Sequence, residues 1–106
     1  MLDLLSDDAA ARVRAALAEI GAEESQIWRL GVAEDSFGVV PGGSVQVEIR
    51  PPGRWHEATE RAWADLGKAL IAAGGVFRKG TTTRSARLIR PGCVLSVCWS
   101  RKGDDR

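Results

Sequence analysis

Two stretches of the chain carry apolar residues at helical spacing. In the first, apolar residues recur every third or fourth position from Ala10 to Ile20, which predicts a helix over 7–20. Ser6 is a good N-cap for this helix, and Gly21 suits the left-handed conformation that often follows a helix end. The pattern therefore gives the first helix both a start and a stop.

A second apolar stripe predicts another helix over 55–73, which Gly74 and Gly75 end. On its polar side, Glu57 and Arg61 have the i,i+4 spacing of a helical ion pair in the favourable order. This second helix is expected to bury its apolar side against a sheet.

Alternation of apolar and polar residues predicts strands in the rest of the chain. The clearest strand is 45–49, where Val45, Val47 and Ile49 alternate with polar residues. Turns are expected over 33–36, at Pro41-Gly42-Gly43 and at Pro91-Gly92. The pattern predicts an α+β fold, with two helices packed on an antiparallel sheet. The other strands are predicted at 27–32, 37–40, 76–79, 84–90 and 94–100.

The two halves of the chain share an order of elements. Each half reads as a helix, a Gly stop and then strands joined by Pro-Gly, so that Pro41-Gly42 matches Pro91-Gly92. This suggests an αββ(β)-αββ(β) pseudo-repeat, although residues as common as Ala, Leu, Gly and Pro also recur by chance. A length of 106 residues suits one domain over 1–106, of which 101–106 are expected to form a frayed tail.

The net charge of +1 conceals a division along the chain. Residues 1–50 hold nine acids and four bases, whereas residues 76–106 hold eight bases and two acids. Such a division marks either a surface for an acidic partner or nucleic acid, or two chain ends that neutralise each other. No apolar stretch reaches the roughly 18 residues of a membrane span, and no secretory signal is recognisable, so a cytoplasmic protein is expected.

The two cysteines, Cys93 and Cys98, are expected on one strand. At about 3.3 Å per residue their Cα atoms would lie about 17 Å apart, too far for a disulfide. Their apolar neighbours indicate reduced core thiols that react slowly. Together with His56, the only histidine, they are too few for a structural zinc site, so no metal or cofactor is predicted.

One group of residues has the composition of an acid–base site: His56 with Glu57 and Glu60. On a helix over 55–73, Glu60 would share the face of His56. A solvated polar surface at a helix start explains the same residues, and no catalytic residue is predicted.

The basic hairpin over 78–90 is the strongest functional signal. Its strand alternation places Arg84 and Arg90 on one face and Arg87 on the other. Arginine recognises carboxylates and phosphates well, whereas charges also protect an exposed edge strand from aggregation. As surface residues, these three arginines are expected to be replaceable by Ser with little change in the melting transition. The predicted contact residues of the hairpin are Arg78, Lys79, Arg84, Arg87 and Arg90.

Core packing explains most of the four tryptophans, but Trp28 and Trp55 lie near element ends and are candidate partner anchors. The leading hypothesis is a small non-enzymatic interaction protein, an inhibitor or accessory factor, that binds another protein through a charged or tryptophan-containing surface. The alternative is a nucleic-acid-binding domain that uses the hairpin 78–90, against which the lack of a stacking aromatic in the basic run counts. An enzyme of unknown class comes third.

Overall fold

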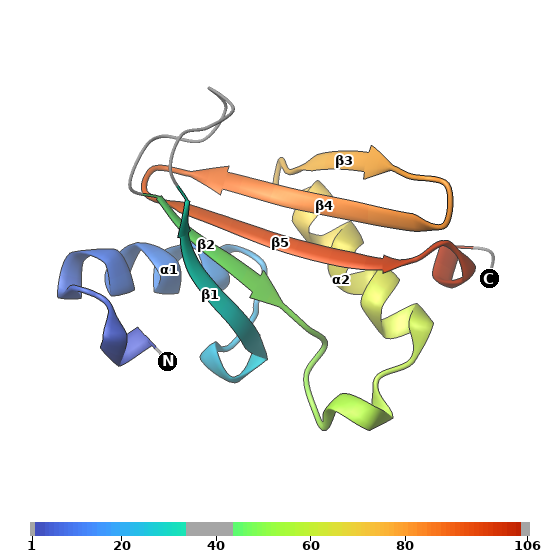
Figure 1. The fold of residues 1–106 in the computed structure, drawn as a ribbon, viewed down its shortest axis with the longest axis horizontal. Coiled ribbons are helices and arrows are strands. Elements are labelled where there is room, and N and C mark those ends of the chain that lie inside the picture. Colours follow the sequence, from blue (N-terminus) through green and yellow to red (C-terminus); the bar gives the residue numbers. More distant parts are fainter. Residues whose placement is uncertain (1, 34–43, 105–106) are drawn as a thin grey trace.

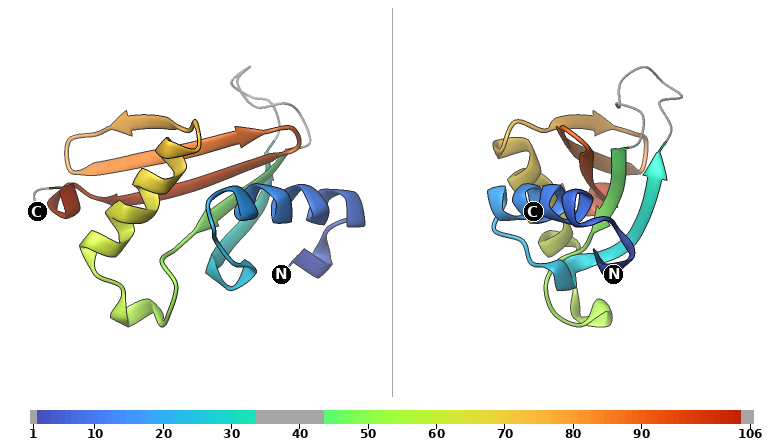
Figure 2. Two further views of the ribbon diagram at one scale, coloured as in Figure 1. Left: turned by 180° about the vertical axis from the view of Figure 1, so that it is seen from behind. Right: turned by 90° about the vertical axis from the view of Figure 1, so that its left-hand side faces the viewer.

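The structure of the chain is a computed structural model that describes residues 2–33 and 44–104. Two helices pack on one face of a five-stranded sheet of order β1-β2-β5-β4-β3 (Figure 1). Figure 2 shows both helices on that same face. The predicted α+β class with two helices on a sheet is confirmed. The elements are α1 (Asp7–Glu19), β1 (Ile27–Ala33), β2 (Ser44–Ile49), α2 (Glu60–Ala72), β3 (Val76–Lys79), β4 (Thr83–Arg90) and β5 (Cys93–Ser100).

The sheet is mixed rather than wholly antiparallel. Its two central strands, β2 and β5, pair in parallel from Val45↔Cys93 to Glu48↔Ser96, whereas the other pairs are antiparallel. The cause is the helical connection: α2 runs back along the helix side of the sheet, so β3 starts again in the direction of β2. It starts at the level where β2 ends, because Val76 lies in the same row as Glu48. Two hairpins later β5 runs in that direction again.

The pseudo-repeat is not confirmed. A real repeat would relate the two halves of the chain by a two-fold symmetry axis. An axis normal to the sheet would make the matching strands β2 and β5 antiparallel, and an axis lying in the plane of the sheet would put the two helices on opposite faces. The parallel central pair with both helices on one face fits neither axis. The predicted strand 37–40, the Pro41-Gly42-Gly43 turn and most of the turn over 33–36 lie outside the described residues.

The ends of α1 agree with the prediction. The Ser6 hydroxyl accepts a hydrogen bond from the Ala9 N–H at 3.2 Å, and Gly21 takes a φ of +66° after the last turn. The side chains of Val13 and Leu17 project from the helix into the core, where they are buried.

The predicted second helix begins too early. Thr59 is the true N-cap, because its hydroxyl accepts a hydrogen bond from the Ala62 N–H at 3.1 Å and its backbone is extended. Trp55–Glu57 forms a separate 3-10 turn before it. The expected helical pair of Glu57 and Arg61 is therefore wrong, and Arg61 pairs instead with Asp65 at 3.1 Å.

The core lies between the helices and the inward face of the sheet. Val47, Leu95 and Leu70 are among its fully buried side chains. The chain end also belongs to the fold: Arg101–Asp104 forms a 3-10 turn whose Gly103 is buried against the first turn of α2. The predicted frayed tail is thus wrong for these residues, since close packing of Gly103 holds them in place.

Candidate functional site

A hollow opens on the sheet face that points away from both helices, here called the open face. It arises because β2 stops at Ile49 whereas its parallel neighbour β5 continues to Ser100. Their last pair is Glu48↔Ser96, so β5 has no β2 neighbour beyond Ser96. The chain leaves the sheet after Ile49 and turns beside the uncovered part of β5.

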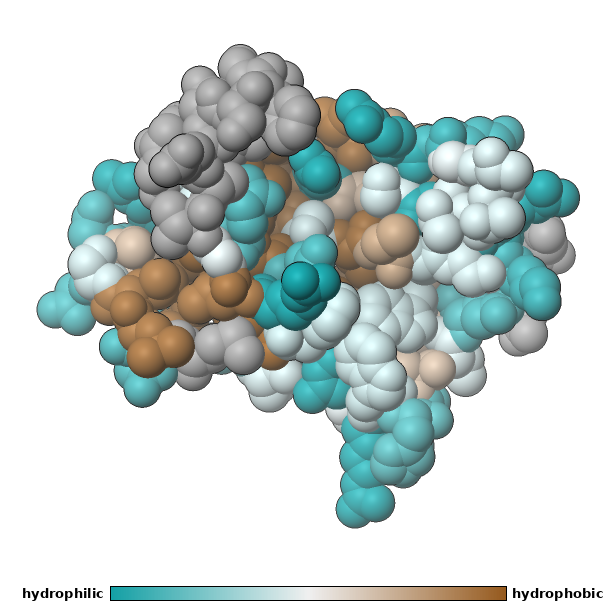
Figure 3. Space-filling model, viewed as in Figure 1, coloured by the Kyte–Doolittle hydropathy of each residue, from teal (hydrophilic) through white to brown (hydrophobic). Residues whose placement is uncertain are grey.

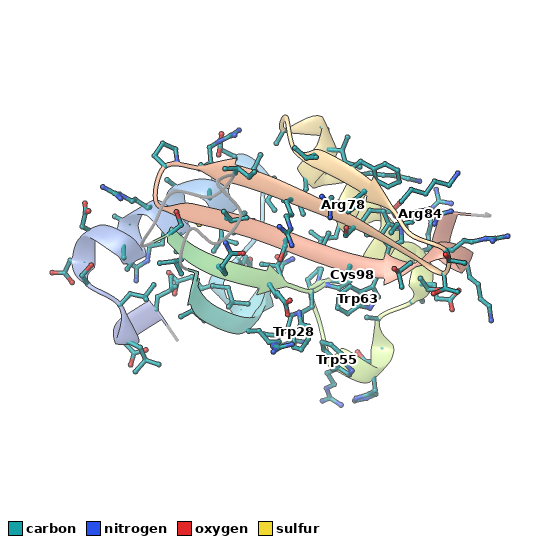
Figure 4. The ribbon with its side chains drawn as sticks, turned by 45° about the horizontal axis from the view of Figure 1, so that its top comes forward. Trp28, Trp55, Trp63, Arg78, Arg84 and Cys98 are labelled. Carbon is teal, nitrogen blue, oxygen red and sulfur yellow. The ribbon has the colours of Figure 1, made fainter. Side chains whose placement is uncertain are left out.

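Three tryptophans from three separate elements surround this gap. Trp28 lies on β1, Trp55 on the 3-10 turn and Trp63 on the first turn of α2. The ring centroids of Trp28 and Trp55 are 5.2 Å apart, and those of Trp55 and Trp63 are 5.4 Å apart. Figure 4 shows all three on the same side of β5, near Cys98. The cavity they border, here called the tryptophan hollow, measures about 440 Å³.

Two of these indoles are unusually accessible for tryptophan. Trp28 is 39% exposed and Trp55 is 53% exposed, whereas Trp63 is half-buried against the core. Arginine side chains flank them. The guanidinium of Arg29 lies 5.5 Å from the centroid of the Trp28 ring, and the guanidinium of Arg50 lies 6.0 Å from the centroid of the Trp55 ring. These cation–π contacts hold the exposed rings in place without covering them.

The rest of the hollow is polar. The sheet register places Glu48, Ser96 and Arg87 in one row across β2, β5 and β4. All three border the hollow, with the carboxylate on the side of Trp28 and the guanidinium on the opposite side. The carboxylate of Glu48 also pairs with Arg29 at 3.6 Å. The hollow thus combines an aromatic wall, a floor of small polar residues and one exposed cation.

A smaller depression of about 110 Å³ adjoins the hollow on β3 and β4. The register puts Arg78 opposite Ser85 on these two strands. Ser85 and Arg87 border both cavities, which therefore form one continuous surface. Figure 3 shows this part of the open face as mainly pale and teal, whereas brown gathers toward β1 and the N-terminal end.

The predicted basic hairpin does not form a single surface. Arg78 and Arg87 are exposed on the open face, whereas Lys79 is exposed at the register position of Arg84, on the helix side. Arg84 is only 8% exposed and donates hydrogen bonds to the carbonyls of Gly80 (2.7 Å) and Thr83 (3.0 Å). It holds the β3–β4 turn together, so the expectation that Arg84 is a dispensable surface residue is wrong.

Arg90 also has a structural role. Its guanidinium contacts both carboxylate oxygens of Glu19 on α1, at 2.9 and 3.1 Å, and donates to the Ala73 carbonyl at 3.0 Å. It thereby joins β4 to the ends of both helices. This pair also shows acidic and basic parts of the chain neutralising each other, which was the second interpretation of the divided charge.

The two cysteines lie on one strand, as predicted, but on opposite faces. Cys93 points into the core, where burial raises the pKa of its thiol to about 11. Cys98 is exposed on the open face and borders the tryptophan hollow. The prediction of two core thiols is therefore wrong for Cys98, because strand alternation over an odd number of residues reverses the side-chain direction.

His56 does not form an oriented acid–base group. It lies in the 3-10 turn with its side chain 73% exposed, 3.9 Å from Glu57. Since Glu60 begins α2, the expected shared helical face of His56 and Glu60 is wrong. The solvated polar surface is the interpretation that this geometry supports.

Sequence reasoning missed the part that Trp63, Glu48, Ser96 and Cys98 play in the hollow. Trp63 fits the apolar stripe of the second helix and was interpreted as core. The available signal was the unequal length of the 45–49 and 94–100 strands. Its meaning depended on knowing that these two strands are neighbours, which the pattern alone does not tell.

Among residues 2–33 and 44–104, no group of three or more His, Cys, Asp or Glu side chains is placed to hold a metal ion. In the same part of the chain, every helix is too short or too polar to cross a membrane. No family model, curated protein or solved structure matches this chain, so the chemistry of the hollow stands on its own residues.

Proposed function

We propose that this protein is a non-enzymatic interaction protein, an inhibitor or accessory factor, that binds a segment of another protein in the tryptophan hollow. The observation that carries the proposal is the exposure of Trp28 (39%) and Trp55 (53%) beside a cavity of about 440 Å³. An aromatic side chain buries about 150–250 Å² in all, and the exposed 39% of Trp28 and 53% of Trp55 remain for a partner to cover. Tryptophan is also enriched at the energetic centres of protein interfaces. A partner side chain in the hollow would remove this apolar surface from water.

The surroundings of the hollow suit binding more than catalysis. The Cys98 thiol and the Arg87 guanidinium both border it, but His56 belongs to the exposed turn and is not among the residues that line the hollow. A nucleophilic thiol works with a base held within hydrogen-bonding reach. The walls supply rigid aromatic surface and the floor supplies polar groups, a combination that anchors one side chain and orients its backbone.

A selection from a random peptide library tests this function. The intact protein is the bait, and the W28A and W55A variants measure how far each selected peptide depends on the hollow. Peptides that bind the native protein are expected to change its tryptophan emission, and to lose at least tenfold in affinity toward either variant. The matched control is F77A, because Phe77 is similarly exposed (45%) but lies on β3, away from the hollow. Binders that ignore both tryptophan substitutions would refute the proposal.

A nucleic-acid-binding domain is the second candidate, and one observation favours it. The basic run of the sequence lacks an aromatic residue, but the fold brings Arg87 to the same hollow as Trp28 and Trp55. Bases stack on exposed indoles while arginines contact the phosphates. Binding of a single-stranded decanucleotide that weakens in W55A and in R87S would support this candidate over the first.

A further inference from the structure

We propose that the occupant of the tryptophan hollow is an extended acidic segment of a partner protein that crosses β5 and β4 toward β3. One large apolar side chain fills the hollow, and carboxylates that follow it in the segment contact Arg87 and Arg78. This inference rests on the proposed function and specifies the partner's chemistry.

The path from the hollow to the arginines follows two adjacent rows of the sheet. The register pairs Cys98 with Ser85 and Ser85 with Arg78, so these three side chains lie side by side on the open face. In the neighbouring row, Ser96 pairs with Arg87. Because the side chains between the hollow and the arginines are small, a chain lying across the strands meets no bulky obstacle in these rows.

The length of this path sets the spacing of the ligand. Neighbouring strands are about 4.8 Å apart, so Arg87 on β4 and Arg78 on β3 lie about 5 and 10 Å from β5 in the direction across the sheet. An extended peptide advances about 3.3 Å per residue. Acidic residues two to four positions after the apolar anchor therefore reach the two guanidinium groups.

The charges on the open face are complementary to such a segment. Within the described residues, the guanidinium groups of Arg78 and Arg87 have no ion-pair or hydrogen-bond partner, whereas Arg29 is paired with Glu48 at 3.6 Å. An exposed, unneutralised arginine offers a planar fork that matches a carboxylate. Arg78 and Arg87 therefore supply the recognition that Arg84 and Arg90, bound within the fold, do not.

Glu48 favours a peptide over a nucleic acid. Its carboxylate borders the hollow beside Trp28, with 43% of its side chain exposed. A base stacked on Trp28 would bring its own phosphate close to this carboxylate and its partner Arg29, an ion pair whose opposite charges offer a phosphate little net attraction. A peptide can place a neutral apolar residue beside Glu48 and Trp28 and its acidic residues against Arg87 and Arg78. It then fits the apolar end and the basic end of the surface at once.

Arrayed nine-residue peptides test the inference with the full chain. One set has Leu, Phe or Trp followed at two to four positions by Asp or Glu; a matched set replaces these acids by Asn or Gln, and a third replaces the anchor by Ala. The acidic set is expected to bind at least tenfold more tightly than the amide set at low salt. Raising the salt from about 20 to 200 mM should reduce that advantage, because the contacts are exposed.

Protein variants then locate the effect. The R78S/R87S double variant should bind the acidic and amide peptides equally, whereas R101S, which removes an exposed charge outside the hollow, should keep the preference. Thermal melting confirms that the variants fold. Tryptophan-dependent binding with no preference for acids overturns this inference and leaves the proposed function standing. Peptide binding that ignores W28A and W55A overturns both. If all peptides fail to bind and a decanucleotide binds through the same residues, the peptide inference is overturned and the partner is a nucleic acid.

Discussion

Gly67 of α2 lies so close to the indole of Trp99 on β5 that a Cβ atom on Gly67 would stand 2.3 Å from Cζ3 of the ring. The absence of a side chain at this one helical position lets α2 approach the sheet. Because α2 carries Trp63 to the tryptophan hollow, this contact also sets one wall of the candidate site.

Replacing Gly67 by Ala is expected to destabilise the protein by about 1–2 kcal/mol in urea denaturation. Alanine gains about 1 kcal/mol of helix propensity, but a Cβ atom 2.3 Å from the ring puts the cost of overpacking in the upper part of the usual range of about 1–3 kcal/mol. Trp99 is only 4% exposed and its ring packs 6.1 Å from that of Phe77, so the indole has little room to move. A double variant with Trp99→Phe, which removes the crowded ring atoms, should lose less than the two single losses combined. An increase in stability for G67A alone would contradict this packing.

The arginines of the hairpin are expected to differ in their effect on stability according to the sheet face on which they lie. Arg84→Ser should lower the free energy of unfolding by about 1–3 kcal/mol, since it removes two hydrogen bonds whose charged donor is itself only 8% exposed. Arg90→Ser should cost about 1 kcal/mol, because its ion pair with Glu19 is partly exposed. Arg78→Ser and Arg87→Ser should stay within about 0.5 kcal/mol. Equal losses in all four variants would show that the face of the strand does not determine their role.

The two thiols are expected to react at different rates. In native protein at pH 8, a chromogenic disulfide reagent should label Cys98 rapidly and Cys93 only after denaturant is added, because Cys98 is exposed and Cys93 is buried. The C98S variant should lose the rapid phase and keep the slow one. Two slow thiols in native protein would contradict the outward direction of Cys98.

The raised pKa of Cys93 predicts a loss of stability at alkaline pH. Its ordinary pKa of 9.0 applies to the unfolded chain and a pKa of about 11 to the folded one. Between these values the unfolded state has released the proton that the folded state keeps, so stability falls as pH rises from about 9 to 11, by at most about 1.4 kcal/mol per pH unit. The chain has no tyrosine to titrate in this window. Urea denaturation of C93A should show a smaller slope with pH, and an unchanged slope would assign the effect to other groups.

Gly103 is expected to be sensitive to substitution although it lies near the chain end. A Cβ atom there would stand 2.6 Å from the Glu60 carbonyl oxygen and 3.2 Å from Cβ of Ala64, so Gly103→Ala should displace the 3-10 turn from α2. We expect a lower melting temperature and faster amide exchange in this turn. Lys102→Ala, at an exposed neighbouring position, is the control. Equal behaviour of the two variants would indicate that the turn does not depend on this contact.

The elements were predictable from the sequence because their signals are local. The stripe around Val13 and Leu17 and the alternation of Val45, Val47 and Ile49 report which face of an element is buried. Neither pattern names the neighbouring element. The parallel pairing of β2 with β5 therefore could not be predicted, and neither could the start of α2, where the cap at Thr59 overrides the apolar stripe.

The candidate site was predictable only in part. Trp28 and Trp55 were selected for their positions near element ends, and both border the hollow. Trp63 was not selected, since an apolar stripe looks the same whether it faces the core or a cavity. The hairpin arginines were selected for their charge, which gives no information on contacts such as the one between Arg90 and Glu19 across most of the chain.

The parallel pairing of β2 with β5 also has a consequence for the order in which the chain folds. The β1–β2 pair and the β3–β4–β5 set join strands that follow one another in the sequence. In contrast, partners in the central β2–β5 pair, such as Val47 and Leu95, are separated by nearly half of the 106-residue chain. Closing a loop of that length costs entropy before any central contact forms. The hairpins are therefore expected to form early, and joining them along β2 and β5 is expected to limit the folding rate. Since the tryptophan hollow lies where this junction ends, the hollow is expected to be completed only in the last step of folding.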